Sequence, residues 1–256
     1  MSWAARRRVV ILLIVGAFVI AFLATVSIAA LYETPSCADG MQNQGEDGID
    51  CGGACAYLCT AQVLPPAVLF TKALGAGGGR TDVIASVENK NVAAAAKDVP
   101  YRITLFGTGQ SLIQEVTGTL DLPPGAGTPV YVPGIASGKQ VVVRAFLSIA
   151  EGAPRWFALP SGVRAVPFVS NIRQSGALAA PRIDAALTNP TSVPFSNVRT
   201  IILVHDKDGD VMAASQTVIL SIPAQGQATA TFTWNRAFPD APVAIEVVPI
   251  VPLSGP

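Results

Sequence analysis

Four cysteines carry the most versatile chemistry in this sequence, and all of them fall in one short segment: Cys37, Cys51, Cys55 and Cys59. Four thiols at close spacing can form two disulfides, bind a tetrahedral zinc ion or provide a redox-active pair. Zinc knuckles and thiol-redox enzymes use paired C-x-x-C spacing, which does not occur here. We therefore predict two disulfides in an oxidising compartment, and the spacing leaves all three pairings open.

Oxygen-bearing side chains crowd the same segment: Asp39, Asn43, Glu46, Asp47 and Asp50. Calcium takes six to eight oxygen ligands in proteins. The segment is therefore a candidate calcium site with four ligands, Asp39, Asn43, Glu46 and Asp50. The alternative is turn chemistry, in which these side chains support tight turns and the carboxylates face solvent. We expect no cofactor other than this calcium ion.

The segment from Cys37 to Cys55 reads CADGMQNQGEDGIDCGGAC. It resembles a short cysteine-rich module that recurs in secreted and surface proteins, with the pattern C-x-D-G-x-x-N-x-x-E-x-x-x-D-C-G-G-x-C. Ten positions match without a gap: Cys37, Asp39, Gly40, Asn43, Glu46, Asp50, Cys51, Gly52, Gly53 and Cys55. The chain departs from the module at its end, where three residues instead of two separate Cys55 from Cys59. The resemblance covers less than a tenth of the chain.

The other residues with catalytic potential are better explained by structure. His205 is the only histidine, and no G-x-S-x-G nucleophile elbow accompanies it. The run 206–210 opens like an EF-hand loop, but Thr217 holds the position of the bidentate glutamate, so we predict a hairpin turn. The run 75–80 lacks the Gly-Lys-Ser/Thr end of a phosphate loop and indicates a hairpin loop. We predict that the protein is not an enzyme; a thiol-redox or hydrolytic enzyme is the weaker alternative.

An uncharged run from Val9 to Tyr32 decides which compartment these residues occupy. As a helix it would be about 36 Å long, enough to cross a hydrocarbon core of about 30 Å. Three arginines directly precede it, so the positive-inside rule places residues 1–8 in the cytoplasm and the bulk of the chain outside. A cleaved signal peptide is the alternative, but its apolar region is normally only about 7–15 residues long. We predict a single-pass cell-membrane protein that contacts lipid through residues 9–32.

The composition of the chain argues against some functions and some kinds of structure. The formal net charge is zero and 13% of the residues are charged, which argues against nucleic acid as a partner because phosphate contacts need clustered Lys and Arg. Hydrophobic residues make up 50% of the chain, which argues against disorder. Glycine and proline recur between short runs of β-branched and aromatic residues, a pattern that predicts an all-β fold.

Residues 83–132 and 183–232 can be aligned with a shift of 100 and no gap. Turn and strand-end residues then coincide: Asn89 with Asn189, Gly109 with Gly209 and Pro123 with Pro223. The alternation of apolar residues also agrees and pairs Ile103 with Leu203. We predict two tandem immunoglobulin-like antiparallel β-sandwiches, over residues 63–165 and 166–256, after a disulfide-bonded module over residues 33–62.

The second repeat resembles the FxLYD-like and related immunoglobulin-like domains of bacterial envelope proteins. The residues that carry this resemblance are Asn189, Ile202, Leu203, Val204, His205, Asp206, Gly209, Pro223 and Gly226. The resemblance implies a non-catalytic sandwich. We therefore expect a membrane-anchored structural or interaction protein with an unidentified protein partner. The alternative is an accessory subunit of an envelope secretion, pilus or division assembly, packed through small residues of its helix: Gly16, Ala17, Ala21 and Ala24.

Overall fold

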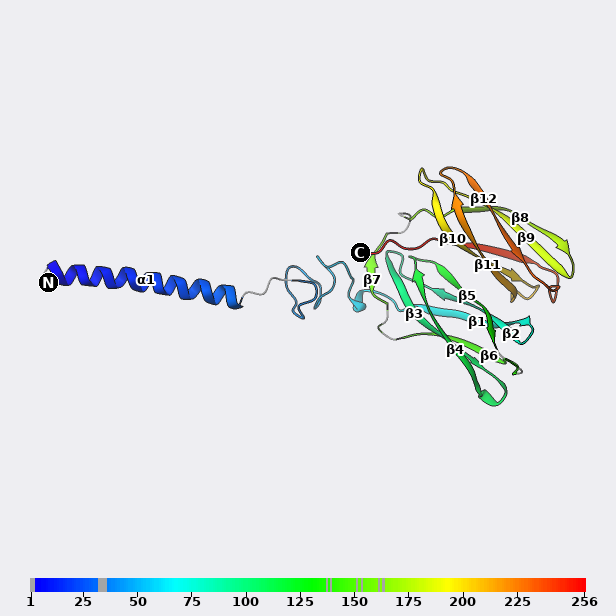
Figure 1. Cartoon of the computed structure of the whole chain (residues 1–256), viewed down its shortest axis with the longest axis horizontal. Helices are drawn as coiled ribbons and strands as arrows, with labels where there is room; N and C mark the ends of the chain where they lie inside the picture. The colour runs from blue at the N-terminus through cyan, green and yellow to red at the C-terminus, as the bar shows by residue number, and fades with distance from the viewer. Residues whose placement is uncertain are drawn as a thin grey trace.

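The computed structural model describes residues 3–31, 36–136, 138, 140–150, 152, 154–160, 162 and 164–256. In these residues one N-terminal helix is followed by a small disulfide-bonded segment and then by antiparallel β-sheets (Figure 1). The predicted all-β fold class is confirmed. Residues 33–35, the start of the predicted cysteine module, lie outside the described part of the chain.

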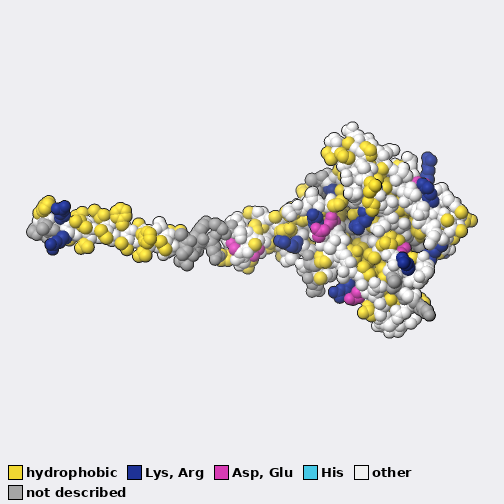
Figure 2. Space-filling model, in the orientation of Figure 1, with side chains coloured by type: hydrophobic (Ala, Val, Ile, Leu, Met, Phe, Trp, Pro, Cys, Tyr) yellow, Lys and Arg dark blue, Asp and Glu magenta, His cyan; other side chains and the backbone are white. Residues whose placement is uncertain are grey.

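Helix α1 spans Trp3–Leu31. It begins before the predicted apolar run, so the three arginines lie within its first turns, and Tyr32 lies outside the described residues. An 18-residue stretch within the segment Arg6–Ile28 has a mean hydropathy of 3.1, and the apolar side chains of this segment are exposed along the helix (Figure 2). By length and composition this is one helix able to span a membrane.

The described residues of the first sandwich form seven strands in two sheets. Their bounds are β1 (Ala67–Gly77), β2 (Arg80–Glu88), β3 (Ala94–Phe106), β4 (Leu112–Leu122), β5 (Gly127–Ala136), β6 (Arg144–Ile149) and β7 (Trp156–Ala158). One sheet has the order β1-β2-β5 and the other the order β4-β3-β6, with β7 also paired to β3. Alternate residues of β2 and β3, such as Val83 and Ile103, meet in a common core.

The second sandwich contains six strands in the same kind of arrangement. Their bounds are β8 (Phe168–Ala177), β9 (Ala180–Thr188), β10 (Phe195–His205), β11 (Val211–Ile222), β12 (Gln227–Thr233) and β13 (Ala244–Ile250). The sheets have the orders β12-β9-β8 and β11-β10-β13, and their core includes Ile183, Ile202 and Phe232. Two short 3-10 turns, η1 (Thr60–Gln62) and η2 (Thr108–Gln110), complete the described secondary structure.

One buried asparagine closes the same end of each sandwich. The Asn89 Nδ2 group donates to the carbonyl oxygens of Ala94, Leu122 and Pro123, at 2.8, 3.2 and 2.9 Å. The Asn189 Nδ2 group donates to the corresponding carbonyls of Val193, Ile222 and Pro223, at 2.8, 3.3 and 3.1 Å. The strands that precede these residues, β2 and β9, end at Glu88 and Thr188, directly before the asparagines that the sequence predicted at the strand ends.

The gapless alignment is wrong by one residue in β3 and β10. Asn89 reaches the carbonyl five residues later, whereas Asn189 reaches the carbonyl four residues later. Ile103 therefore corresponds to Ile202, because both face the core of their own sandwich, and Leu203 faces the opposite way. Side chains alternate between the two faces of a strand, so a slip of one residue moves each of them to the other face.

Candidate functional site

All four cysteines are paired within the small segment that precedes the sheets. The disulfides join Cys37 to Cys55 and Cys51 to Cys59, with Cα–Cα distances of 5.7 and 4.9 Å. The two predicted disulfides are therefore present, and the pairing that the spacing left open is resolved. The short loops that they close restrict the unfolded segment, which has little core of its own.

The candidate calcium ligands Asp39 and Asp50 lie close together, but their oxygens already accept hydrogen bonds. The Asp50 carboxylate accepts from the backbone N–H groups of Asp39 and Gly40 at 3.0 Å. The Asp39 carboxylate accepts from the Asn43 side chain at 2.9 Å and from the Met41 N–H at 2.9 Å. The hydrogen bond from Asn43 is the main reason that the pKa of Asp39 is lowered, followed by those from backbone N–H groups.

The other two acidic side chains of the segment also support its backbone. The buried Glu46 carboxylate accepts from the Asp50 N–H at 3.2 Å and lies 3.0 Å from the sulfur of Cys55, which is oxidised and has no proton to donate. Asp47 accepts from the Gly53 N–H at 3.0 Å and from the Gln62 side chain at 2.8 Å. These contacts are the turn chemistry that the sequence offered as the alternative, and calcium binding stays a prediction.

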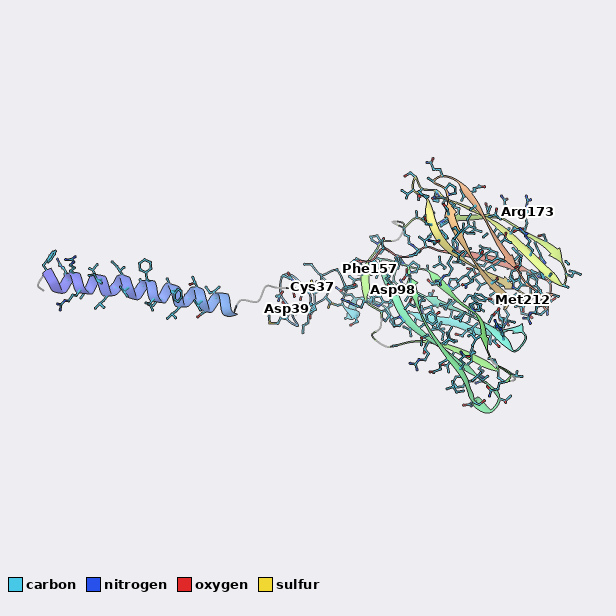
Figure 3. All side chains as sticks on the ribbon, viewed as in Figure 1. Cys37, Asp39, Asp98, Phe157, Arg173 and Met212 are labelled. Carbon is cyan, nitrogen blue, oxygen red and sulfur yellow. A yellow bond between two sulfur atoms is a disulfide. The ribbon has the colours of Figure 1, made fainter. Side chains whose placement is uncertain are left out.

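The disulfide-bonded segment is attached to the first sandwich through strand β7. Tyr57 forms a β-bridge with Phe157, and the Leu58 N–H donates to the Trp156 carbonyl at 2.8 Å. The Arg155 guanidinium lies 3.8 Å from the centre of the Tyr57 ring, a cation–π contact. In Figure 3, Phe157 lies at the end of the sandwich nearest to Cys37 and Asp39.

The two sandwiches share an apolar layer that the sequence analysis did not predict. The outward face of the β1-β2-β5 sheet packs against the outward face of the β11-β10-β13 sheet. The buried members of this interface layer are Leu74, Ile84, Ile201, Leu203, Val211 and Ala214. Strands β2 and β10 are therefore buried on both faces. The signal was present as uninterrupted apolar runs at 83–85 and 201–204, which are typical of strands covered on both sides.

The other two outward faces carry polar residues at the corresponding positions. Asp184 stands in β9 where Ile84 stands in β2, and the Asp184 carboxylate pairs with Arg182 at 2.8 Å. Arg102 stands in β3 where Ile201 stands in β10, and it pairs with Glu115 at 3.5 Å. The facing sheets of the two sandwiches are therefore apolar at these positions and cover each other there, whereas the corresponding positions of the other two sheets hold ion pairs.

An open cleft of about 430 Å³ lies where the two sandwiches separate, beside the interface layer. On one wall the Tyr131 hydroxyl donates to the Asp82 carboxylate at 2.7 Å, and burial followed by this hydrogen bond raises the pKa of Tyr131. On the other wall the Trp234 indole N–H donates to the Ala214 carbonyl at 3.2 Å. Met212, another lining residue, is at the end of the molecule farthest from α1 (Figure 3).

The remaining candidates from the sequence lie in or beside hairpin turns. The His205 Nδ1 atom lies 3.0 Å from the Gly209 carbonyl oxygen, and Asp206 accepts from the N–H groups of Asp208 and Asp210 at 3.0 Å each. Residues 206–210 thus form the hairpin turn between β10 and β11 that the sequence predicted. Likewise β1 and β2 pair directly up to Gly77 and Arg80, so the glycine-rich run is a hairpin loop.

Comparisons with known proteins give no family for the chain. No family model matches it, and no curated protein matches its sequence. Among solved structures, a transglutaminase from red sea bream aligns over 75% of this chain with 12% identity and a TM-score of 0.24. The chain spans 32% of the length of that transglutaminase. A TM-score at this level supports no argument about fold or activity.

Proposed function

We propose that this protein is a membrane-anchored, extracytoplasmic structural or interaction protein that presents two immunoglobulin-like sandwiches to a protein partner and is not an enzyme. In this proposal residues 1–8 are cytoplasmic, residues 9–32 cross the cell membrane, and 33–62, 63–165 and 166–256 form the cysteine module and the two sandwiches. The equivalent hydrogen bonds of Asn89 and Asn189 support a tandem repeat of one unit.

The interface layer is the observation that carries the proposal. Ile84 and Ile201 are buried between the sandwiches, and each fully buried aliphatic side chain stabilises such a contact by roughly 1.5–3 kcal/mol. The salt bridge between Lys72 and Asp210, at 3.5 Å, also joins the sandwiches, but it is exposed and adds little. Two sandwiches held in this way present their loops and sheet edges in a fixed relation, which suits a binding surface assembled from both.

Protection from protease tests the membrane arrangement. An epitope tag after residue 256 should be lost when protease is added to intact spheroplasts, and a tag before residue 1 should persist until the membrane is opened. Survival of the C-terminal tag in intact spheroplasts, together with loss of the N-terminal tag, would reverse the proposed orientation.

Chemical cross-linking in the native membrane tests the binding role. The wild-type chain should give defined cross-linked products, and an Ile84→Asp variant, in which the two sandwiches are expected to separate, should give fewer. An Ile172→Asp variant is the matched control, because Ile172 is 38% exposed on the outer strand β8. Equal products from all three proteins would contradict a binding surface assembled from both sandwiches.

A second role, as an accessory subunit of an envelope secretion, pilus or division assembly, is favoured by one feature of α1. Gly16 and the nearby Ala17, Ala21 and Ala24 have small or no side chains, so a neighbouring helix can approach α1 closely there. Replacing residues 9–32 with an unrelated apolar helix of equal length should then abolish co-purification of the assembly. Retained co-purification would restrict partner binding to the sandwiches.

A further inference from the structure

Residues 251–256, here called the tail, leave the second sandwich and lie on the first. Leu253 is 3% exposed and packs with Ala95 of β3 and Phe157 of β7 in a small cluster of its own. A Cβ at Gly255 would lie 3.3 Å from the Lys97 side chain and 3.8 Å from the Phe157 ring. The tail is thus in close contact with the sandwich to which it does not belong.

A single carboxylate fixes the backbone of the tail. Asp121, near the end of β4, accepts from the Leu253 N–H at 2.8 Å and from the Asp98 N–H at 3.0 Å. Asp98 has a positive φ of 52° at the bulge in β3. Its N–H therefore needs a hydrogen-bond partner other than the backbone carbonyls of the neighbouring strand. Asp121 therefore connects the β3 bulge and the tail through its two oxygens.

Phe157 joins three parts of the chain, because it contacts both the disulfide-bonded segment and the tail from its place in the first sandwich. It belongs to the first sandwich, it forms the β-bridge with Tyr57 of the disulfide-bonded segment, and it packs against Leu253 of the tail. Tyr57 also packs directly against the cluster that contains Leu253. The tail of the second sandwich and the segment next to α1 thus bury the same side chain.

We propose that the tail is a clasp that couples the second sandwich to the disulfide-bonded segment across β7. Opening of the tail would expose Phe157 and loosen Tyr57 and Leu58, even though these residues lie about 200 positions away in the sequence. The clasp and the interface layer both hold the second sandwich to the first. The clasp lies beside Phe157, at the end of the two sandwiches near Cys37, whereas Met212 lies at the other end (Figure 3). It does not depend on the identity of the partner or on the membrane orientation proposed above.

Hydrogen exchange of the full-length protein in detergent tests the clasp. A Leu253→Ala variant should raise exchange at the Leu58 amide, which donates to the Trp156 carbonyl, by about tenfold or more, because truncating a buried leucine removes most of its packing. Leu220→Ala is the matched control, since Leu220 is 76% exposed. The Ile103 and Ile202 amides, in the two cores, should stay protected and show that both sandwiches remain folded.

A second variant keeps the test valid if Leu253→Ala folds poorly. Asp121→Asn keeps one oxygen acceptor but turns an amide donor towards one of the two backbone N–H groups, so the tail should loosen without loss of a core side chain. Faster exchange at Leu58 in this variant supports the clasp. Exchange that rises only at residues 251–256 while Leu58 stays at the wild-type rate overturns it, because the tail would then be a local contact without coupling.

Discussion

Substitution of Ile84 by aspartate should separate the two sandwiches without unfolding either of them. Ile84 has no exposed surface, and its side chain faces the second sandwich rather than the core of its own. The corresponding residue of the second sandwich is Asp184, so this position of the sheet accommodates aspartate when it faces water. The structure therefore predicts that the damage falls on the interface layer.

The size of the effect follows from two contributions. Loss of the buried isoleucine lowers the free energy that holds the two sandwiches together by roughly 1.5–3 kcal/mol, and an unpaired carboxylate buried between them costs several kcal/mol more. The total cannot exceed the free energy of docking, because separation of the sheets returns the carboxylate to water. Even about 3 kcal/mol raises the open fraction by roughly 100-fold.

Calorimetry and proteolysis of the full-length protein in detergent measure this effect. The wild type should unfold in one transition that includes both sandwiches, and Ile84→Asp should unfold in two. Trypsin should also cleave the variant faster at Arg164, a half-buried residue in the segment between the sandwiches. Ile172→Asp should behave like the wild type. A single transition in Ile84→Asp, with Arg164 cleaved at the wild-type rate, would refute the reasoning.

Three further perturbations test the cores, the surface charges and the acidic loop. Asn89→Ala and Asn189→Ala each remove the side-chain donor of three carbonyl groups, of which those of Leu122 and Ile222 are buried, so each should destabilise its own sandwich by about 1–3 kcal/mol in chemical denaturation; a loss below about 0.5 kcal/mol would show that the asparagines do not hold the strand ends. Arg182 and then Thr231 lower the pKa of Asp184, so its contribution to stability is present above the ordinary pKa of 3.8 and is lost as the pH falls through the lower folded pKa. The melting temperature of Asp184→Asn should accordingly fall less than that of the wild type between about pH 5 and pH 2, and parallel curves would exclude this pair as a source of acid sensitivity. Calcium, titrated calorimetrically, should bind with a dissociation constant in the millimolar range or weaker, because the oxygens of Asp39 and its neighbours already accept hydrogen bonds; micromolar binding would show that the loop rearranges around the ion.

The strands were predictable from the sequence because their signals are local. Alternating apolar residues mark the strands, and an asparagine follows β2 and β9 at the point where each strand ends. Asp206–Asp210 was predictable as a turn for the same reason, since short polar side chains cap their own backbone. The number of disulfides was also predictable, because the four cysteines lie close together in the sequence.

The remaining features depend on contacts between distant parts of the chain. The alignment failed by one residue because Asn189 reaches its first carbonyl partner four residues later and Asn89 reaches its own five residues later, and no local signal marks that difference. The pairing of Cys37 with Cys55 depends on how the acidic loop folds back on itself. Leu253 is one apolar residue in an irregular segment, so its burial on the first sandwich could not be anticipated.

The distribution of apolar and polar outward faces has a consequence for neighbouring copies of the chain. Contacts that join a surface patch to a different patch on the next molecule grow into open fibres unless the geometry closes. Here both apolar patches of the interface layer are on the same chain and cover each other, and the corresponding positions of the other two sheets hold Arg182 with Asp184 and Arg102 with Glu115. The interface layer is therefore already occupied within each chain and is not available to join one chain to the next.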